Sequence, residues 1–566
     1  MTISAFKKFK IFFILSSFIA FFMPALSWAQ VDVETQTREV NRPILQEIEQ
    51  TLSPAKDSEP EIEKEEMPAV EEGPKFLVKE ILLEGVTTFD PKEFAPLLEQ
   101  YTNREISLAQ LKQLTKSIEK EYLKKGVIAA CIIPPQKSSD GIITLRIIEA
   151  KMGQLNVKPH KYFNNKRINY YWLPESGKIL KYGEMNKSLH MINKNPDRKA
   201  KATLHPGEVP ETTDVTIETA TEFPYHLTGS FDKEGVASTG EERKGLGFKH
   251  NNFLNLDDTV VFGENFGDDF NSIYAFHSIP LNKHGTSVVY GYSYSKSFPK
   301  KEFEVFGIAS RSRNSSISIK QDFFVDNQYA GEVSIGLDAN DKWTQQNAIT
   351  TTKDRLRILR YAGQYLLKGN GQLAVFDAKA SQGINGFGAR RQNILSSRGS
   401  KNTFTKFNFN TEYRKALPKR TQLDLKVKSQ IASNKLPSQE QFYLGGINSV
   451  RGYPSGDFLG DDGVVMNVEF IIPAFFIPNT WKLPYMTNPL QDYFTLVTFY
   501  DYGWANKRHP SSSELDTANF MSIGGGIRIN LFNRATIRLE SGTPIADETI
   551  TESGKTRFHF SINFES

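Results

Sequence analysis

The sequence predicts a transmembrane β-barrel of about sixteen antiparallel strands, preceded by two small α/β domains. Three observations predict it: an N-terminal export signal, two successive units that mix helices with strands, and about 340 residues of alternating polarity that begin at Tyr225. In this last region apolar residues take one side of each strand, and Arg, Lys and Asn take the other. That pattern is typical of strands that face lipid outside and water inside.

The first 29 residues have the layout of a secretory signal peptide. Three lysines precede an apolar run from Ile11 to Phe22, and the small residues Ser27 and Ala29 flank Trp28. We expect cleavage after Ala29; an uncleaved membrane anchor is the alternative, but the run is short for one. The net charge of +4 over 566 residues does not indicate a nucleic-acid binder, which would concentrate basic residues on one face.

Residues 30–74 are expected to form an N-terminal helix and an acidic linker. "EPEIEKEEMPAVEEGP" (59–74) is rich in glutamate and broken by prolines, which favours a solvated linker. Within 38–52, Ile44, Ile48 and Leu52 follow one another at helical spacing. We expect a short helix there that either plugs the barrel at rest or lies loosely on a surface.

Two copies of one α/β unit follow, predicted at 75–151 and 152–222. In the first, "FLVKEILLEGV" is a predicted strand and Asp90-Pro91 a predicted helix start. Ser107 and Gln110 can form a capping box before a second helix that ends at Gly126. Two strands complete a β-α-α-β-β order, and the same order repeats more faintly from Gly153.

Residues 223–566 are predicted to form the barrel. A soluble β-sandwich would also alternate, but it would bury its apolar face, whereas here aromatic faces recur along hundreds of residues. An even number of strands is expected, because the chain enters and leaves such a barrel on the same side. We therefore interpret 303–311 as a loop, which leaves sixteen strands around a water-filled lumen. The seventeen candidate strands start near residues 225, 243, 257, 270, 286, 303, 315, 330, 353, 371, 403, 421, 463, 494, 520, 534 and 556.

The candidate functional site lies in the long interval between the strands near 421 and 463. It contains Val450-Arg451-Gly452-Tyr453, a cation within a glycine-rich stretch. Loops of this length in compact scaffolds are usually functional or disordered. The loop is either a solvated flap with Arg451 at the surface or a segment that folds inward and carries Arg451 to a carboxylate.

The strand "TFYDYGW" (498–504) offers such a carboxylate. If its tyrosines face lipid, then Phe499, Asp501 and Gly503 face the lumen, and Arg451 can form a charge-assisted pair with Asp501. The same alternation makes Glu469 a second candidate. No nucleophile motif, P-loop, metal-binding pair or CxxC is present, so we expect no enzyme, cofactor or metal site.

Two such units before a barrel, with V-R-G-Y in a long loop and F-x-D-x-G on a later strand, resemble the outer-membrane transporter superfamily that includes BamA. Within it, the chain is similar to the two-partner secretion transporters (TpsB), the haemolysin secretion/activation family of FhaC and ShlB. The resemblance covers nearly the whole mature chain, and it identifies the two α/β units as periplasmic POTRA domains.

This resemblance implies a pore that secretes a large partner exoprotein (TpsA), recruited by the POTRA domains through strand addition at a sheet edge. Outer-membrane lipid, lipopolysaccharide and the barrel assembly machinery would be further partners, and nucleic acid would not. The alternatives are a BamA-like insertase, which usually carries more POTRA domains, a passive porin, which needs no soluble domains, and an enzyme barrel, for which no motif is found.

Overall fold

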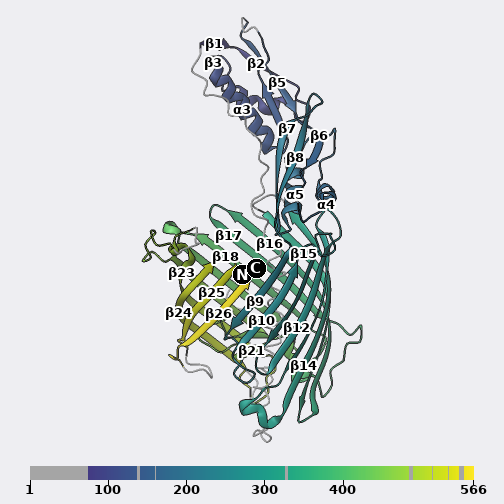
Figure 1. Cartoon of the computed structure of the whole chain (residues 1–566), viewed down its shortest axis with the longest axis vertical. Coiled ribbons are helices and arrows are strands. Elements are labelled where there is room, and N and C mark those ends of the chain that lie inside the picture. Colours follow the sequence, from purple (N-terminus) through teal and green to yellow (C-terminus); the bar gives the residue numbers. More distant parts are fainter. Residues whose placement is uncertain are drawn as a thin grey trace, which may run out of the picture.

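The computed structural model describes residues 74–136, 140–159, 161–324, 329–482, 488–512, 514–532, 534–546 and 553–566. The expected signal peptide and the helix expected at 38–52 lie outside these residues. The described chain forms a barrel with two α/β units stacked on one of its ends (Figure 1). Within the described residues, no helix has the length and apolar character needed to cross a membrane.

The first α/β unit packs one long helix on a small sheet. Ser107 caps that helix by accepting from the backbone N–H of Gln110, as the capping box predicts. Its buried stripe, Leu111, Leu114, Ile118 and Tyr122, meets the sheet formed by β2, β5 and β4. The elements are β1 (Lys75–Val78), β2 (Glu80–Glu84), η2 (Pro91–Phe94), α2 (Ala95–Leu98), β3 (Arg104–Ser107), α3 (Leu108–Lys124), β4 (Ala129–Ile132) and β5 (Ile142–Glu149).

Two details of this unit differ from the predicted order. The predicted strand at 76–86 is divided into β1 and β2, and β3 lies between the two helices, where it pairs with β1. Strands of four or five residues are too short to produce a readable alternation of polarity. The first predicted helix is one 3-10 turn followed by one α turn.

The second unit repeats the arrangement with a three-stranded sheet in the order β6–β8–β7. Backbone hydrogen bonds join the two units, because Ile128 donates to Leu180 and Tyr182 donates to Gly126. The elements are β6 (Lys151–Val157), α4 (Asn165–Tyr171), α5 (Tyr182–Asn193), β7 (Arg198–Pro206) and β8 (Thr212–Thr221).

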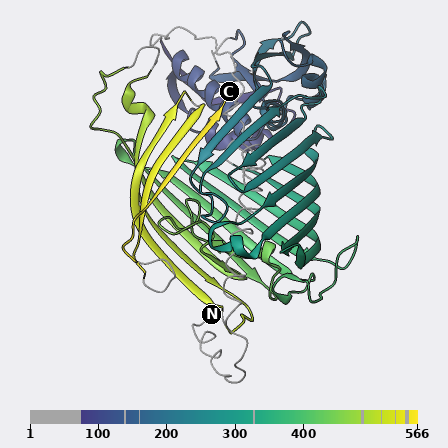
Figure 2. The ribbon, with the colours of Figure 1, turned by 60° about the horizontal axis from the view of Figure 1, so that its bottom comes forward.

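Sixteen antiparallel strands then close into a barrel, in which β26 pairs with β9 (Figure 2). The predicted number of strands is therefore confirmed. The strands are β9 (Tyr225–Asp232), β10 (Arg243–His250), β11 (Thr259–Phe266), β12 (Phe270–Pro280), β13 (Thr286–Ser297), β14 (Ile308–Phe324), β15 (Tyr329–Gln346), β16 (Ile349–Gly369), β17 (Gln372–Gly383), β18 (Thr405–Ala416), β19 (Gln422–Ala432), β22 (Asp462–Pro473), β23 (Phe494–Asn506), β24 (Thr517–Leu531), β25 (Ala535–Pro544) and β26 (Arg557–Glu565).

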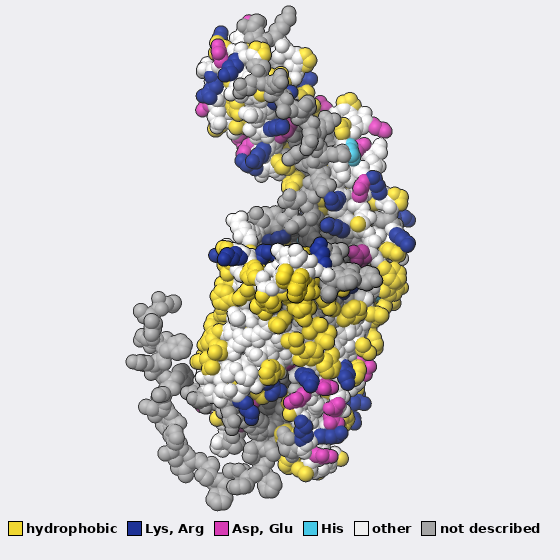
Figure 3. All heavy atoms as spheres, turned by 60° about the vertical axis from the view of Figure 1, so that its left-hand side comes forward, with side chains coloured by type: hydrophobic (Ala, Val, Ile, Leu, Met, Phe, Trp, Pro, Cys, Tyr) yellow, Lys and Arg dark blue, Asp and Glu magenta, His cyan; other side chains and the backbone are white. Residues whose placement is uncertain are grey.

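The alternation of the strands separates an apolar outer face from a polar inner face. On β13, Tyr290 and Tyr292 are 45% and 43% exposed, whereas Ser293 and Ser295 are buried. On the face of the barrel seen in Figure 3, hydrophobic side chains form a band, with charged side chains above and below it. This is the surface that a membrane-spanning barrel presents to lipid.

The segment 303–311 was predicted to be a loop, and this is only partly correct. Lys301–Phe306 forms the 3-10 helix η3, but β14 begins at Ile308, seven residues before the predicted start. The early part of β14 carries Arg311 and Arg313 among serines, so its outward face is not apolar there. A strand that continues beyond the apolar band loses the periodicity by which sequence analysis detects it.

Candidate functional site

The loop between β19 and β22, residues 433–461, folds back into the barrel. Within it β20 (Phe442–Leu444) pairs with β21 (Phe458–Gly460), and the connection between these strands holds the predicted motif. Val450 and Tyr453 are fully buried and Arg451 is 1% exposed. The hypothesis of a solvated flap is therefore wrong, and the inward arrangement is the observed one.

Arg451 forms a bidentate ion pair with Asp501 through one edge of its guanidinium group. Its Nε donates to Oδ2 and its Nη2 donates to Oδ1, each at 2.7 Å, and its backbone N–H donates to Oδ2 at 3.0 Å. Asn467 Nδ2 also donates to Asp501, at 2.8 Å. Asp501 is fully buried, because the alternation of β23 points it into the lumen beneath the loop.

Two glutamates accept from the remaining nitrogen of the same guanidinium group. Arg451 Nη1 lies 2.6 Å from Glu469 Oε1 and 3.0 Å from Glu540 Oε2. Glu469 on β22 was singled out from the sequence, whereas Glu540 on β25 was not. The signal for Glu540 was present, because Leu539 beside it faces outward at 45% exposure, which turns Glu540 inward.

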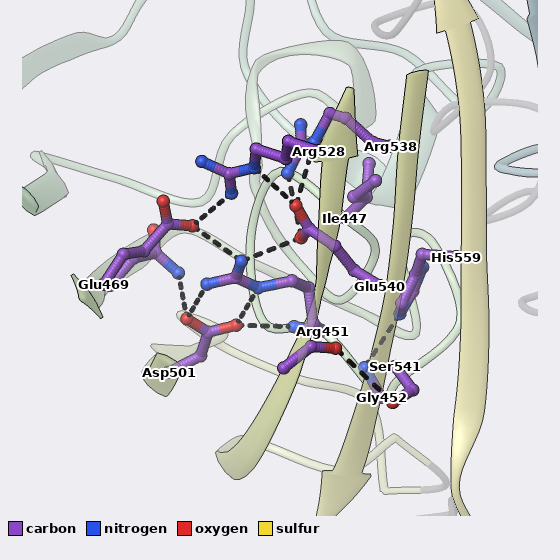
Figure 4. A network of polar contacts seen from close by, with 12 residues as sticks. Ile447, Arg451, Gly452, Glu469, Asp501, Arg528, Arg538, Glu540, Ser541 and His559 are labelled. Carbon is purple, nitrogen blue, oxygen red and sulfur yellow. Dashed lines mark hydrogen bonds and ion pairs between the residues drawn. The ribbon is translucent and has the colours of Figure 1, made fainter. Parts of the chain in front are cut away.

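Two further arginines balance these carboxylates. Arg528 on β24 reaches Glu469 at 2.9 Å and Glu540 at 2.7 Å, and Arg538 on β25 reaches Glu540 at 3.0 Å (Figure 4). Three guanidinium groups thus face three carboxylates, so the cluster carries no net formal charge. Buried charges are tolerated when they are paired and hydrogen-bonded in this way. We name these six residues the loop lock: Arg451, Glu469, Asp501, Arg528, Arg538 and Glu540.

The other residues predicted to face the lumen shape the space around Arg451. Its guanidinium carbon lies 3.4 Å from the centre of the Phe499 ring, a cation–π contact. A Cβ at Gly503 would lie 2.6 Å from Val450, and one at Gly542 would lie 2.7 Å from the backbone nitrogen of Gly452. Glycine at these two positions therefore allows the loop to lie directly against the barrel wall.

A second set of contacts, not singled out from the sequence, ties the loop to the closing strands. The N–H of Gly452 donates to His559 Nε2 at 3.0 Å, and His559 Nδ1 lies 2.8 Å from Glu234. Glu234, between β9 and β10, also accepts from the N–H of Ile447 at 3.1 Å. Tyr453 stacks on Phe520 with the ring centres 4.1 Å apart.

Both ends of the loop are also fixed by ion pairs. Near its start, Glu440 accepts from Arg360 at 2.9 Å and contacts Lys406 at 2.8 Å. At its end, Asp461 accepts from Arg398 at 2.7 and 3.2 Å. The loop is therefore held at its two ends and at Arg451. The contacts of this site restrain the position of the loop in the lumen. Across the described residues, no group of His, Cys, Asp and Glu side chains is arranged to hold a metal ion.

Curated relatives match most of the chain at low identity. The heme/hemopexin transporter protein HuxB of Haemophilus influenzae strain 86-028NP is 21% identical over 83% of each chain. The outer membrane transporter CdiB of Dickeya dadantii is 22% identical over 80% of each chain. The hemolysin transporter protein ShlB of Serratia marcescens is 23% identical over 76% of this chain and 78% of its own.

Solved structures share the fold. CdiB from Escherichia coli superposes with a TM-score of 0.71 at 18% identity, over 97% of this chain and 100% of its own. BamA from Haemophilus ducreyi lacking POTRA domains 1–3 is more distant, with a TM-score of 0.53 at 11% identity over 87% of this chain and 100% of its own.

Two family models match the chain in succession. The model for the POTRA domain of ShlB type matches residues 76–150, which cover nearly all of the first α/β unit. The model for the haemolysin secretion/activation protein ShlB/FhaC/HecB matches residues 211–529, more than half of the chain. The chain therefore belongs to the haemolysin secretion/activation family ShlB/FhaC/HecB.

Proposed function

We propose that this protein is the outer-membrane pore through which a large partner exoprotein is secreted, and that the loop lock holds residues 433–461 in the position that export requires. The observation that carries the proposal is the loop itself, which lies in the lumen and is fixed there through Arg451. The family to which the chain belongs supports the transport function. No catalytic role is proposed for any residue.

The two leading alternatives explain fewer of these features. A BamA-like insertase shares the superfamily, but the likeness to BamA is distant, and the chain has two α/β units before its barrel. A passive porin would not need two soluble domains, nor a loop fixed in its lumen by six charged side chains. Export of a partner accounts for the domains, the barrel and the loop together.

We assign recruitment of the exoprotein to the POTRA domains, with 75–151 as the first domain, 152–222 as the second and 223–566 as the barrel. Strand β7 lies at the edge of the second sheet, where an extended segment of the exoprotein can add as a further strand. Asn193 covers the start of this edge, because its side chain accepts from Ala200 N at 2.6 Å and donates to Ala200 O at 3.0 Å. The accessible edge therefore begins after Ala200. Insertion of the barrel is proposed to depend on the barrel assembly machinery, with lipid and lipopolysaccharide around it.

Deletion of the soluble units tests the proposal. Removal of 75–222 should leave a barrel that inserts and shows heat-modifiable migration, while the partner exoprotein no longer reaches the medium. A shorter deletion, 75–149, is the more specific variant, because it keeps Ala150 in the second core and removes no residue of 150–222. Normal export by either truncated protein would refute recruitment by these domains.

A further inference from the structure

The turn between β10 and β11 exposes apolar side chains at the periplasmic rim of the barrel. Phe253, Leu254 and Leu256 are 55%, 50% and 40% exposed. A hydrogen bond within the turn stabilises its conformation: Asp258 Oδ1 accepts from the N–H of Leu254 at 2.8 Å. A well-ordered turn that displays three large apolar groups is unusual for a surface that contacts water alone.

The acidic residues of this turn point away from that apolar surface. Asp257 forms a bidentate pair with Arg198 of the second α/β unit, at 2.9 and 3.0 Å. Asp258 is fully buried and lies 2.7 Å from His277 on β12. Asp257 is thus paired with a cation and Asp258 is buried inside, so neither carboxylate lies on the outer surface of the turn.

Aromatic and imidazole rings connect the second α/β unit to this rim in one continuous series. Tyr162 meets Phe223, and Phe223 meets Tyr225 at the start of the barrel. The series continues to the exposed turn through His250 and ends at Tyr290 on the apolar outer band. The successive centroid distances are Tyr162–Phe223 5.4 Å, Phe223–Tyr225 4.6 Å, Tyr225–His250 4.2 Å, His250–Phe253 5.8 Å, Phe253–His277 6.4 Å and His277–Tyr290 5.4 Å.

Helix α4 places basic groups beside the same surface. Arg167 donates to the backbone oxygen of Leu256 at 2.8 Å, and its guanidinium group lies 5.0 Å from the centre of the Tyr170 ring, which is 41% exposed. Lys161 and Lys166 are exposed on either side of the start of this helix. In Figure 1, α4 lies directly above the wall of the barrel. We name this surface the rim patch: Lys161, Tyr162, Lys166, Tyr170, Phe253, Leu254 and Leu256.

We propose that the rim patch docks the second POTRA domain onto the periplasmic leaflet of the outer membrane by binding anionic phospholipid headgroups. The ring series joins the patch to Tyr290, which is 45% exposed on the outer face of the barrel. Strands β10 and β11 have only eight residues each, shorter than the roughly nine to eleven of a spanning strand. The apolar turn therefore lies at the depth of the membrane interface, where aromatic and cationic side chains are favoured.

Spin labelling of the full-length protein in lipid nanodiscs tests the proposal. In a Cys131→Ala background, a nitroxide is attached at Asn169→Cys, which is exposed on α4, or at Val209→Cys, which is 64% exposed on the β7–β8 turn of the same domain. We expect the label at 169, but not at 209, to be shielded from a water-soluble nickel relaxant in nanodiscs that contain phosphatidylglycerol. Shielding should weaken in nanodiscs of phosphatidylcholine alone.

Charge reversal supplies the matched variants. One lysine beside an anionic leaflet changes the surface-bound population about fivefold, so Lys161→Glu with Lys166→Glu should abolish the shielding at 169. Lys199→Glu with Lys201→Glu, on exposed β7 positions of the same domain, should leave it unchanged. Three results would overturn the proposal: equal accessibility at 169 and 209, equal shielding in both lipids, or shielding that persists in detergent without lipid. None of these readouts depends on what the pore exports.

Discussion

The POTRA domains and the barrel lumen bury opposite kinds of side chain. The first POTRA domain is organised around aliphatic and aromatic residues such as Leu114, Ile118 and Leu145, each completely buried. The lumen instead buries a balanced set of charges around Arg451. In the domain the buried groups determine whether the chain folds. In the barrel the hydrogen-bonded strands already provide the fold, so the buried charges determine where the loop lies.

The largest expected effect comes from Arg451→Ala. Removal of the guanidinium group leaves Asp501, Glu469 and Glu540 with two arginines, and an uncompensated buried charge costs ~3 kcal/mol or more. Since ~1.4 kcal/mol is a factor of ten, the docked loop should lose roughly a hundredfold in population. We expect an inserted, heat-modifiable barrel with little exoprotein in the medium, measured as secretion per inserted barrel.

Two control variants accompany this test. Arg451→Lys should retain partial secretion, because an ammonium group keeps the charge but lacks the planar fork that holds Asp501. Arg420→Ala removes an arginine that is exposed instead of buried: its side chain is 68% exposed and pairs with Asp492. This variant should secrete normally. Wild-type secretion by Arg451→Ala would show that the loop lock has no part in export.

The same contrast explains which parts of the site sequence analysis could predict. Side chains alternate strictly along a strand, so the inward direction of Phe499, Asp501 and Gly503 follows once β23 is recognised. Alternation does not say which inward residues meet across neighbouring strands. Glu540 and His559 reach the loop because of the registers that join β24, β25 and β26, and those registers depend on the closed barrel.

The fold was predictable to a similar degree. Alternation over hundreds of residues, together with the requirement for an even number, predicted sixteen strands, and capping residues located α3. The ends of strands were harder to predict from the sequence, because β14, for example, extends beyond the apolar band into a polar region. The contacts between the second POTRA domain and the barrel rim were also not predictable, since contacts such as Arg198–Asp257 and Asn251–Asp197 join residues more than fifty positions apart through side chains without a shared motif.

A smaller effect is expected at the junction between the second POTRA domain and the barrel. Arg198 is buried, pairs with Asp257 and also donates to the backbone oxygen of Ile192 at 2.6 and 2.8 Å. Arg198→Ala should weaken this junction by about 2 kcal/mol, because water can enter and partly solvate the carboxylate that remains. Amide hydrogen exchange in 251–258 should rise, and secretion should fall less than in Arg451→Ala. Lys199→Ala, on the exposed neighbouring position, is the control; equal exchange in the two variants would contradict a structural role for the pair.

The smallest expected effect on secretion lies inside the first POTRA domain, at the buried carboxylate of Glu149. Glu149 accepts from the backbone N–H groups of Thr87 and Thr88, each at 2.9 Å, from both their hydroxyls, and from Tyr122 at 3.1 Å. Burial alone would raise the pKa of Glu149, but the hydrogen bonds from Thr87 and Thr88 outweigh it and hold the pKa at about 2.

Because this pKa is lower in the folded domain than in the unfolded chain, the carboxylate stabilises the fold above the unfolded value of about 4.5. That stabilisation is lost as the pH falls from about 4.5 towards 2. Glu149→Gln should therefore lower the free energy of unfolding by roughly 1–3 kcal/mol at neutral pH, and the difference from wild type should shrink across this acid range.

Cys131 provides the measurement, because it is buried in the same core and is the chain's single cysteine. Burial raises the pKa of its thiol to about 12, so its modification reports opening of the domain. The urea dependence of its reaction with 4,4′-dithiodipyridine, which modifies thiols in acid, gives the stability of wild type and variant at each pH. A difference that stayed constant between pH 6 and pH 3 would show that Glu149 acts through packing and not through its charge.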